Sequence, residues 1–304
     1  MEVCHDRMCL IITHNRPTTL TRSLDSVIAQ DFENFFIVVS DNSDNDETRN
    51  IMQKYLLNSN SRISYMHHDD VPSGIDHFNK VLSNNTFDYF MMFHDDDEML
   101  PQMVGTLYNA IKNEPYVSAV APDLFYNENG QYSNRRMVKY DAIKYYDSKE
   151  LAKEFTKLCW PGFPSYMYRA EKMKGIYMNP KEGGKYCDVS FLIKVAAKGY
   201  VKYIPEPLMY YYITSGQDSA KHEYSQYLLL FNFLKRYVER KEDLIPMRLR
   251  NIYAHMIAIQ NERGRIPYKK VILYYFMHYS FKDFFFKYIL RLLGYGYSKN
   301  RKQM

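Results

Sequence analysis

The sequence predicts an α/β fold with a mostly parallel sheet flanked by helices, followed by a helical extension. In the first hundred residues, short apolar runs alternate with longer amphipathic segments, which is typical of strand–helix–strand units. Two of these runs end in strongly acidic turns, as expected at the carboxyl edge of a parallel sheet. From about residue 223 the chain reads as helical and becomes basic, so we expect a separate C-terminal region there.

Four short apolar runs are predicted to be buried strands. They cover residues 8–13, 35–40, 63–66 and 89–93. Helices are expected at about 18–28, 47–57, 73–82 and from 101 onward. Thr18 or Thr19 is the expected cap of the first helix. The middle of the chain, about 115–222, is less regular and rich in Tyr, Gly and Pro.

The 304-residue chain has globular proportions, with 46% apolar and 25% charged residues. These proportions exclude a disordered or low-complexity chain. No apolar run is long enough to span a bilayer as a helix, and no signal peptide is expected. The four cysteines lack zinc or redox spacing, so we expect a reduced, cytoplasmic location.

Charge is distributed unevenly along the chain. Residues 225–304 contain 16 Lys and Arg against 5 Asp and Glu, whereas the first 224 residues contain 24 against 30. In this basic tail, apolar residues recur at helical intervals, namely Phe281, Phe284, Phe285, Tyr288, Ile289 and Leu292. The pattern favours a helix on an anionic membrane surface; the alternative is a helix packed on the domain with a solvated basic face. No nucleic-acid fold pattern accompanies the charge, so no nucleic acid partner is expected.

The segment His94-Asp95-Asp96-Asp97-Glu98 directly follows the fourth apolar run. Adjacent carboxylates repel each other unless a cation is present, and α/β sheets bind ligands in the loops after their parallel strands. Oxygen ligands on one loop suit Mg²⁺ or Mn²⁺, which share their sites with substrate phosphates. A solvated acidic turn before the helix at Pro101 is the alternative. A second acidic turn begins at Asp41. The carboxylate of Asp41 is expected either to accept a hydrogen bond from a nucleotide base or ribose, or to form an ordinary Asx turn.

Several short motifs occur in a distinctive order and spacing. They are Ile12 to Arg16, Ser23 to Gln30 with Phe32, Val38 to Ser43, Gly74 with Asn79, and His94 to Asp97 ahead of Pro101. Together they resemble the nucleotide-binding half of glycosyltransferase family 2, whose members have the GT-A fold with a Rossmann-type sheet. The resemblance covers residues 8–101.

This resemblance implies roles for the matching residues. Residues that would bind a nucleotide-sugar donor are Thr13, Asn15, Arg16, Asp41 and Asp95. Asp96 would bind the divalent metal, Mn²⁺ or Mg²⁺. The first position of the family's DxD motif is His94 here, so His94 or Asp97 is the candidate for a further metal ligand.

An enzyme of this kind needs a carboxylate that removes the proton from the acceptor hydroxyl. Asp188 follows Gly183-Gly184 at the start of a predicted helix, where an ordinary helix cap is the local alternative. The stretch is similar to the family region that contains the catalytic aspartate, so Asp188 is predicted to be the general base, with Glu182 as the second choice. Tyr212 and Thr214 stand where the family has Arg and His.

Two residues of the second half are candidates for acceptor binding. Trp160 lies next to Pro161 and Gly162 and is predicted to stack on a sugar ring, or else to be a buried aromatic beside a turn. Arg169 ends a strand-like segment and is predicted to face the acceptor or diphosphate, or to pair with an acid.

We therefore predict a metal-dependent inverting glycosyltransferase that moves a sugar from a nucleotide donor, UDP-linked in preference, to a lipid-linked bacterial surface glycan at the inner face of the membrane. Residues 1–222 would form the catalytic domain, with about 1–101 for the nucleotide and 102–222 for the acceptor, and 223–304 a helical region. One alternative is a nucleotidyltransferase, although the Gly-rich loop expected after its first strand is missing. The other is a catalytically silent, membrane-docked protein that binds nucleotide sugars.

Overall fold

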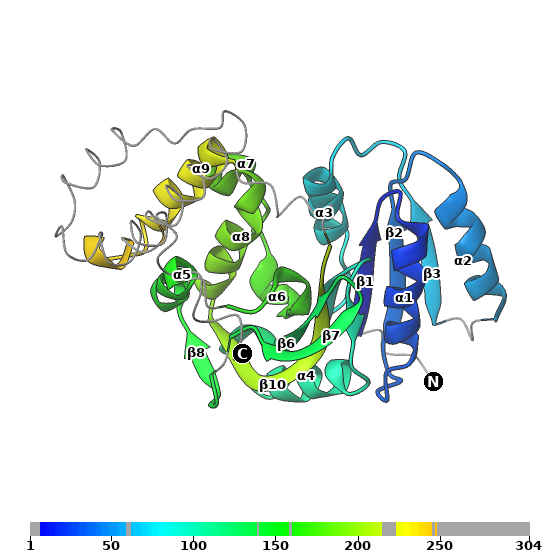
Figure 1. Ribbon diagram of the computed structural model, residues 1–304, viewed down its shortest axis with the longest axis horizontal. Coiled ribbons are helices and arrows are strands. Elements are labelled where there is room, and N and C mark those ends of the chain that lie inside the picture. Colours follow the sequence, from blue (N-terminus) through cyan, green and yellow to red (C-terminus); the bar gives the residue numbers. More distant parts are fainter. Residues whose placement is uncertain are drawn as a thin grey trace, which may run out of the picture. The chain divides into compact units, whose positions relative to one another are not determined.

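The computed structural model describes residues 7–58, 62–138, 140–157, 160–214, 223–244 and 247. Its centre is a sheet with the strand order β3-β2-β1-β4-β9-β6-β10-β5, to which β7 adds beside β6 and β8 beside β10 (Figure 1). Helices pack on both faces of this sheet. The α/β fold class with a mostly parallel sheet is thereby confirmed.

The first four strands are the ones that the apolar runs predict. They are β1 (Arg7–Thr13), β2 (Phe36–Asp41), β3 (Ile63–His67) and β4 (Tyr89–His94). All three neighbouring pairs are parallel, with β1 between β2 and β4. Alternate residues of β1 enter different cores, because Met8 and Leu10 face one side of the sheet and Cys9 and Ile11 the other. Burial on both faces is the reason that this strand reads as a continuous apolar run.

Each of the predicted helices forms. They are α1 (Pro17–Ile28), α2 (Glu47–Asn58), α3 (Gly74–Ser83) and α4 (Met103–Ile111). The predicted cap at Thr18 or Thr19 is wrong: α1 begins at Pro17, and Arg16 is the N-cap residue without a side-chain cap bond. Proline is favoured at this first helical position because its missing N–H has no helical partner there in any case.

Further strands, most of which the sequence pattern did not predict, complete the sheet, and β6 and β10 are the longest of them. The strands are β5 (Glu98–Met99), β6 (Val117–Glu128), β7 (Gln131–Arg136), β8 (Lys144–Tyr146), β9 (Met167–Arg169) and β10 (Tyr200–Ile213). The helices are α5 (Ser148–Lys157), α6 (Ala170–Met173), α7 (Pro180–Gly183) and α8 (Cys187–Ala196). Strand β9 runs antiparallel to both β4 and β6 and so joins the two halves. The sheet is therefore mixed, with parallel pairing in the nucleotide half and between β6 and β10.

Helix α9 (Tyr224–Leu234) packs on α7 and α8. Its Tyr227, Leu230 and Phe233 are buried in the same core as α8. The first compact unit of the chain runs from Met1 to Arg248, so the predicted division at residue 222 stays a prediction. The predictions for the basic tail beyond residue 248, including its membrane association, lie outside the described residues. Within the described residues, no helix is both long and apolar enough to cross a membrane.

Candidate active site at the carboxyl edge of the sheet

The acidic turn after β4 meets the ends of β1 and β2. Thr13 pairs in register with Asp41, and Ile12 with His94. The hydroxyl of Thr13 donates a hydrogen bond of 2.7 Å to Oδ2 of Asp95. Burial raises the pKa of Asp95, while this bond and the charge of Arg16 oppose the rise. The structure thus joins two of the predicted donor-binding residues directly.

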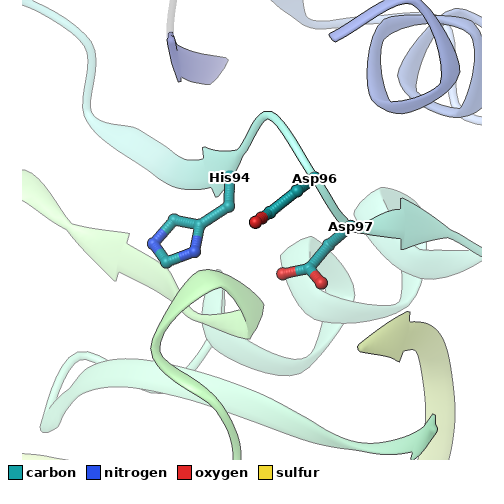
Figure 2. Close-up of side chains that lie close together, drawn as sticks. All are labelled: His94, Asp96 and Asp97. Carbon is teal, nitrogen blue, oxygen red and sulfur yellow. The ribbon is translucent and has the colours of Figure 1, made fainter. Parts of the chain in front are cut away.

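Three side chains of the turn form a group with the composition of a metal site. Ligand atoms of His94, Asp96 and Asp97 all lie within 4.8 Å of one another, and Figure 2 shows their side chains directed toward a common space beneath the turn. Oδ1 of Asp97 accepts the backbone N–H of Tyr212 at 2.9 Å, whereas its Oδ2 is buried and has no hydrogen-bond partner among the described residues. A buried carboxylate oxygen without a partner is costly, so a divalent cation fits this donor set. Burial and the charge of Asp96 raise the pKa of Asp97 well above its ordinary value.

Helix α1 fixes the backbone of the acidic turn. Ser23 donates its hydroxyl to the carbonyl of Asp97 at 2.6 Å, and Nη2 of Arg22 donates to the carbonyl of Asp96 at 2.6 Å. The guanidinium of Arg22 also lies over the ring of Tyr212, 3.7 Å from its centroid. The hydroxyl of Tyr212 donates to Glu98 at 2.7 Å. Sequence reasoning missed Arg22 as a supporting residue, since only the fold brings α1 and β10 to the same turn.

Replacing Arg22 by methionine is expected to loosen the acidic turn. The variant loses the bond to the carbonyl of Asp96 and the ring contact with Tyr212. Because residues behind metal ligands contribute about 10- to 100-fold to metal affinity, we expect Mn²⁺ affinity and kcat to fall about tenfold each. The matched control is Arg62→Met, since Arg62 also donates to a carbonyl and lies over a ring, but at the start of β3. Equal losses in the two variants would contradict this role of Arg22.

Asp188 lies in the first turn of α8, and the ring of Phe163 connects this helix with the end of β4. The ring of His94 lies 5.9 Å from that of Phe163, and Phe163 lies 6.0 Å from Phe191 of α8. Burial raises the pKa of Asp188, and a bond from the N–H of Val189 and the charge of His94 oppose the rise. The carboxyl group of Asp188 is therefore within electrostatic reach of the acidic turn, 94 residues earlier in the chain.

The second candidate for the base is held elsewhere. Oε2 of Glu182 pairs with Nζ of Lys194 at 2.7 Å, and Oε1 lies 3.9 Å from Arg236. Both carboxylate oxygens of Glu182 therefore lie beside cations, and Lys194 contacts one of them directly. The geometry favours Asp188 over Glu182.

A cavity of about 290 Å³ lies beside the ends of β2 and β3. It is lined by Asn42 to Asp46, Arg49, His67 to Asp69 and Val71. Asp41 lies at the end of β2 next to this cavity and is fully buried. Its carboxylate accepts the hydroxyl of Tyr65 at 2.7 Å and the N–H of Ser43 at 2.8 Å. Its predicted contact with a nucleotide therefore needs one of the remaining lone pairs or a rearrangement of Tyr65.

The sequence pattern assigned no role to some polar residues beside this cavity. His68 lines the cavity, and its Nε2 lies 3.0 Å from Oγ of Ser40. Ser40 also contacts Nε2 of the buried His77 at 2.7 Å, and burial lowers the pKa of His77 to about 4. The position of His68 directly after the third strand was the available signal. Asn15, predicted to bind the donor, adopts a positive φ of 53° and accepts the N–H of Asp44 at 3.0 Å, so it ties the loops after β1 and β2 together.

The predicted acceptor role of Arg169 is wrong. Arg169 pairs with Tyr89 at the beginning of β4, about 17 Å along the strand from His94. It is buried and donates to the carbonyls of Val117, Ile111 and Glu114 and to the hydroxyl of Tyr89. The guanidinium of Arg169 therefore stabilises the fold at the edge of the sheet opposite to the acidic turn. It donates to carbonyls and a hydroxyl instead of pairing with an acid.

Replacing Arg169 by methionine is expected to destabilise the protein without changing its chemistry. The loss leaves buried carbonyls unpaired, which we expect to lower the free energy of unfolding by about 2–4 kcal/mol. Denaturant titration checks the loss, and kcat of the folded fraction should stay as in the wild type. Arg62→Met, which removes one carbonyl bond, should cost about 1 kcal/mol. A specific rise in the KM of the acceptor would restore the predicted binding role.

Trp160 is half-buried and packs on Phe155, with ring centroids 4.4 Å apart. It shares a small enclosed void with Tyr166 and Tyr203. This position agrees with the alternative of an aromatic beside a turn, and its stacking on a sugar stays a prediction. Cys159 next to it lies outside the described residues, as does Cys4, whereas Cys9 and Cys187 are free and buried.

The class of the protein is settled by its sequence together with this architecture. Residues 8–174, more than half of the chain, match the family model described as Glycosyl transferase family 2. The protein belongs to this family.

Particular relatives extend the comparison. GalNAc(5)-diNAcBac-PP-undecaprenol beta-1,3-glucosyltransferase of Campylobacter jejuni is 30% identical over 108 residues, which are 35% of this chain and 34% of that relative. This chain thus matches about a third of the length of that relative. TarS 1-349 from S. aureus in complex with UDP-GlcNAc has a TM-score of 0.62 at 15% identity, over 86% of this chain and 76% of that chain.

Mannosyltransferase PcManGT from Pyrobaculum calidifontis in complex with GDP-Man and Mn²⁺ has a TM-score of 0.56 at 16% identity. The similarity covers 94% of this chain and 82% of that chain. At such identities the two structures confirm the fold, and they leave donor and acceptor to be argued from the site.

Proposed function

We propose that this protein is a metal-dependent inverting glycosyltransferase that uses a nucleotide-sugar donor, UDP-linked in preference, and an acceptor hydroxyl. The observation that carries the proposal is Oδ2 of Asp97, which is buried and has no hydrogen-bond partner in the described part of the chain. It lies beside Asp96 and His94, at the edge where β1, β2 and β4 end. Structures of the same fold are described with UDP-GlcNAc and with GDP-Man and Mn²⁺, which supports this class of donor and cofactor.

Asp96, Asp97 and His94 would hold the divalent cation, either Mn²⁺ or Mg²⁺. When bound, such a cation neutralises the negative charge that develops on the departing nucleoside diphosphate. Thr13, Asn15 and Asp95 would position the nucleotide next to this charge. The cavity lined by the loop after β2 and by His67 and His68 is where we place the base and ribose.

Asp188 would accept the acceptor's proton as the new bond forms. The acceptor oxygen attacks the anomeric carbon, the bond from that carbon to the diphosphate oxygen breaks, and the proton moves to the carboxylate of Asp188. Attack from the face opposite the leaving group inverts the anomeric configuration in one displacement. The burial that raises the pKa of Asp188 makes its carboxylate a stronger base than an exposed aspartate.

The acceptor that we propose is a lipid-linked bacterial surface glycan. The C. jejuni relative carries PP-undecaprenol in its name, which supports an acceptor of this kind. An enzyme that acts on such an acceptor would work at the cytoplasmic face of the cell membrane as a peripheral protein. Binding of the tail to anionic lipid is part of this proposal and is tested by flotation with vesicles.

The experiment that tests the function measures the released nucleotide. Purified protein is incubated with Mn²⁺ and a panel of UDP- and GDP-sugars, and the products are separated by ion-exchange chromatography. Slow hydrolysis of one donor to the nucleoside diphosphate supports the proposal. Release of pyrophosphate would instead identify a nucleotidyltransferase. Tight binding of a donor without turnover, even in the presence of acceptor glycolipids, would identify a silent binding protein.

A further inference from the structure

Arg16 contacts two carboxylates of the acidic turn that would hold the metal ion. Its Nη1 atom lies 3.0 Å from Oδ2 of Asp96 and 3.2 Å from Oδ1 of Asp95. Asp96 belongs to the proposed metal group, so a carboxylate of that group already has a cationic partner. Arg16 is thus an internal cation in contact with the metal site.

The shape of the turn does not depend on Arg16. Asp95 is also held by the hydroxyl of Thr13, and the carbonyls of Asp96 and Asp97 are held from α1. The side chain of Arg16 is 50% exposed and extends from the N-cap of α1, so it can leave Asp96 without unfolding a core. Its two ion pairs therefore act on the charge of the site more than on its architecture.

We propose that Arg16 makes divalent metal and nucleoside diphosphate bind cooperatively. Without nucleotide, the guanidinium neutralises Asp96 and repels an incoming dication across a few ångströms. A diphosphate offers Arg16 a new anionic partner, which frees Asp96 for the metal and adds phosphate oxygens as ligands. The inference rests on the proposed function, because it needs the metal and nucleotide sites to adjoin. It adds that this chain disfavours metal binding in the absence of donor.

The size of the effect follows from the exposure of the pair. Coupling between two sites is typically 5- to 150-fold, and a half-exposed ion pair belongs at the low end because water screens it. We therefore expect Arg16 to weaken the binding of Mn²⁺ alone by about tenfold, and UDP to restore most of this loss.

The test measures metal binding without turnover. Free Mn²⁺ is followed by electron paramagnetic resonance during titration of wild type, Arg16→Gln, Arg16→Lys and Arg62→Gln, each with and without UDP, and with GDP as a second arm. Arg62→Gln removes the same charge from the start of β3, at the opposite edge of the sheet. Circular dichroism of each variant confirms that it is folded.

The expected result is specific to position 16. Arg16→Gln binds Mn²⁺ alone about tenfold more tightly than wild type and gains less from UDP, while Arg62→Gln and the charge-retaining Arg16→Lys behave as wild type. Unchanged Mn²⁺ affinity in Arg16→Gln, or equally tight binding by Arg16→Lys, would overturn the inference and leave the proposed enzyme intact. If no protein binds Mn²⁺ even with UDP or GDP, the metal-dependent function itself fails with it.

Discussion

Asp96→Asn is expected to lower kcat for sugar transfer by about a thousandfold and to leave the fold unchanged. Asparagine keeps an oxygen that accepts the bond from Arg16, so the turn retains its partner. It loses the negative charge that a divalent cation requires from this central member of the group. Transfer is measured as the nucleoside diphosphate released in the presence of Mn²⁺, and Mn²⁺ binding by paramagnetic resonance should weaken in parallel.

Asp31→Asn is the control for Asp96→Asn, because Asp31 is an exposed aspartate in the loop after α1. It should show wild-type transfer and wild-type Mn²⁺ binding. Loss of transfer in Asp96→Asn with undiminished Mn²⁺ affinity would show that the ion binds elsewhere, and full activity of Asp96→Asn would remove the metal role of the turn altogether.

Asp188→Asn is the second large effect that we expect, with transfer reduced by about 10²- to 10⁴-fold. The amide cannot accept the proton of the acceptor hydroxyl, but Asp188 is not a member of the group formed by His94, Asp96 and Asp97. Donor binding and Mn²⁺ affinity should therefore remain, which separates this variant from Asp96→Asn. Glu182→Gln is the control, since Glu182 is paired with Lys194; it should keep transfer within a few-fold. The reverse pattern would make Glu182 the base.

The pH dependence gives an independent check on Asp188. Because burial raises its pKa, the proton is lost at a higher pH than from an ordinary aspartate. Transfer should rise with pH as the carboxylate forms. The midpoint of this rise should lie at a higher pH than the ordinary pKa of an aspartate. The folded state binds this proton more tightly than the unfolded chain, so the free energy of unfolding falls as pH rises from the unfolded pKa to the folded one. Asp188→Asn removes this penalty and should melt at the same temperature or higher near neutral pH.

Much of the nucleotide half was predictable because its signals are local. Burial on both faces makes the central strand of the parallel sheet a short apolar run, and those runs predicted β1 to β4 within one or two residues. Parallel strands align their carboxyl ends, so the turns after β1, β2 and β4 had to meet once the strands were placed. The order and spacing of the motifs then indicated the family.

The acceptor half was less predictable because its contacts are distant in sequence. The partner of Asp97 is the backbone of Tyr212, 115 residues later, and no local pattern encodes that bond. Arg169 illustrates the same limit, since a basic residue at a strand end looks the same whether it faces a ligand or a buried helix end. Only its pairing with Tyr89 at the amino end of β4 shows that Arg169 faces the buried helix end.

The sequence alone determined the α/β class, the acidic edge and the family, because hydrophobic period and motif spacing are properties of neighbouring residues. Tertiary structure decided which carboxylates are buried, paired or partnerless. It left Oδ2 of Asp97 without a partner among the residues that the structure describes, placed Arg16 on Asp96, tied Glu182 to Lys194, and raised the pKa of Asp188 through burial. Burial and charge pairing depend on residues brought together from different elements, and those quantities set the chemistry of a carboxylate.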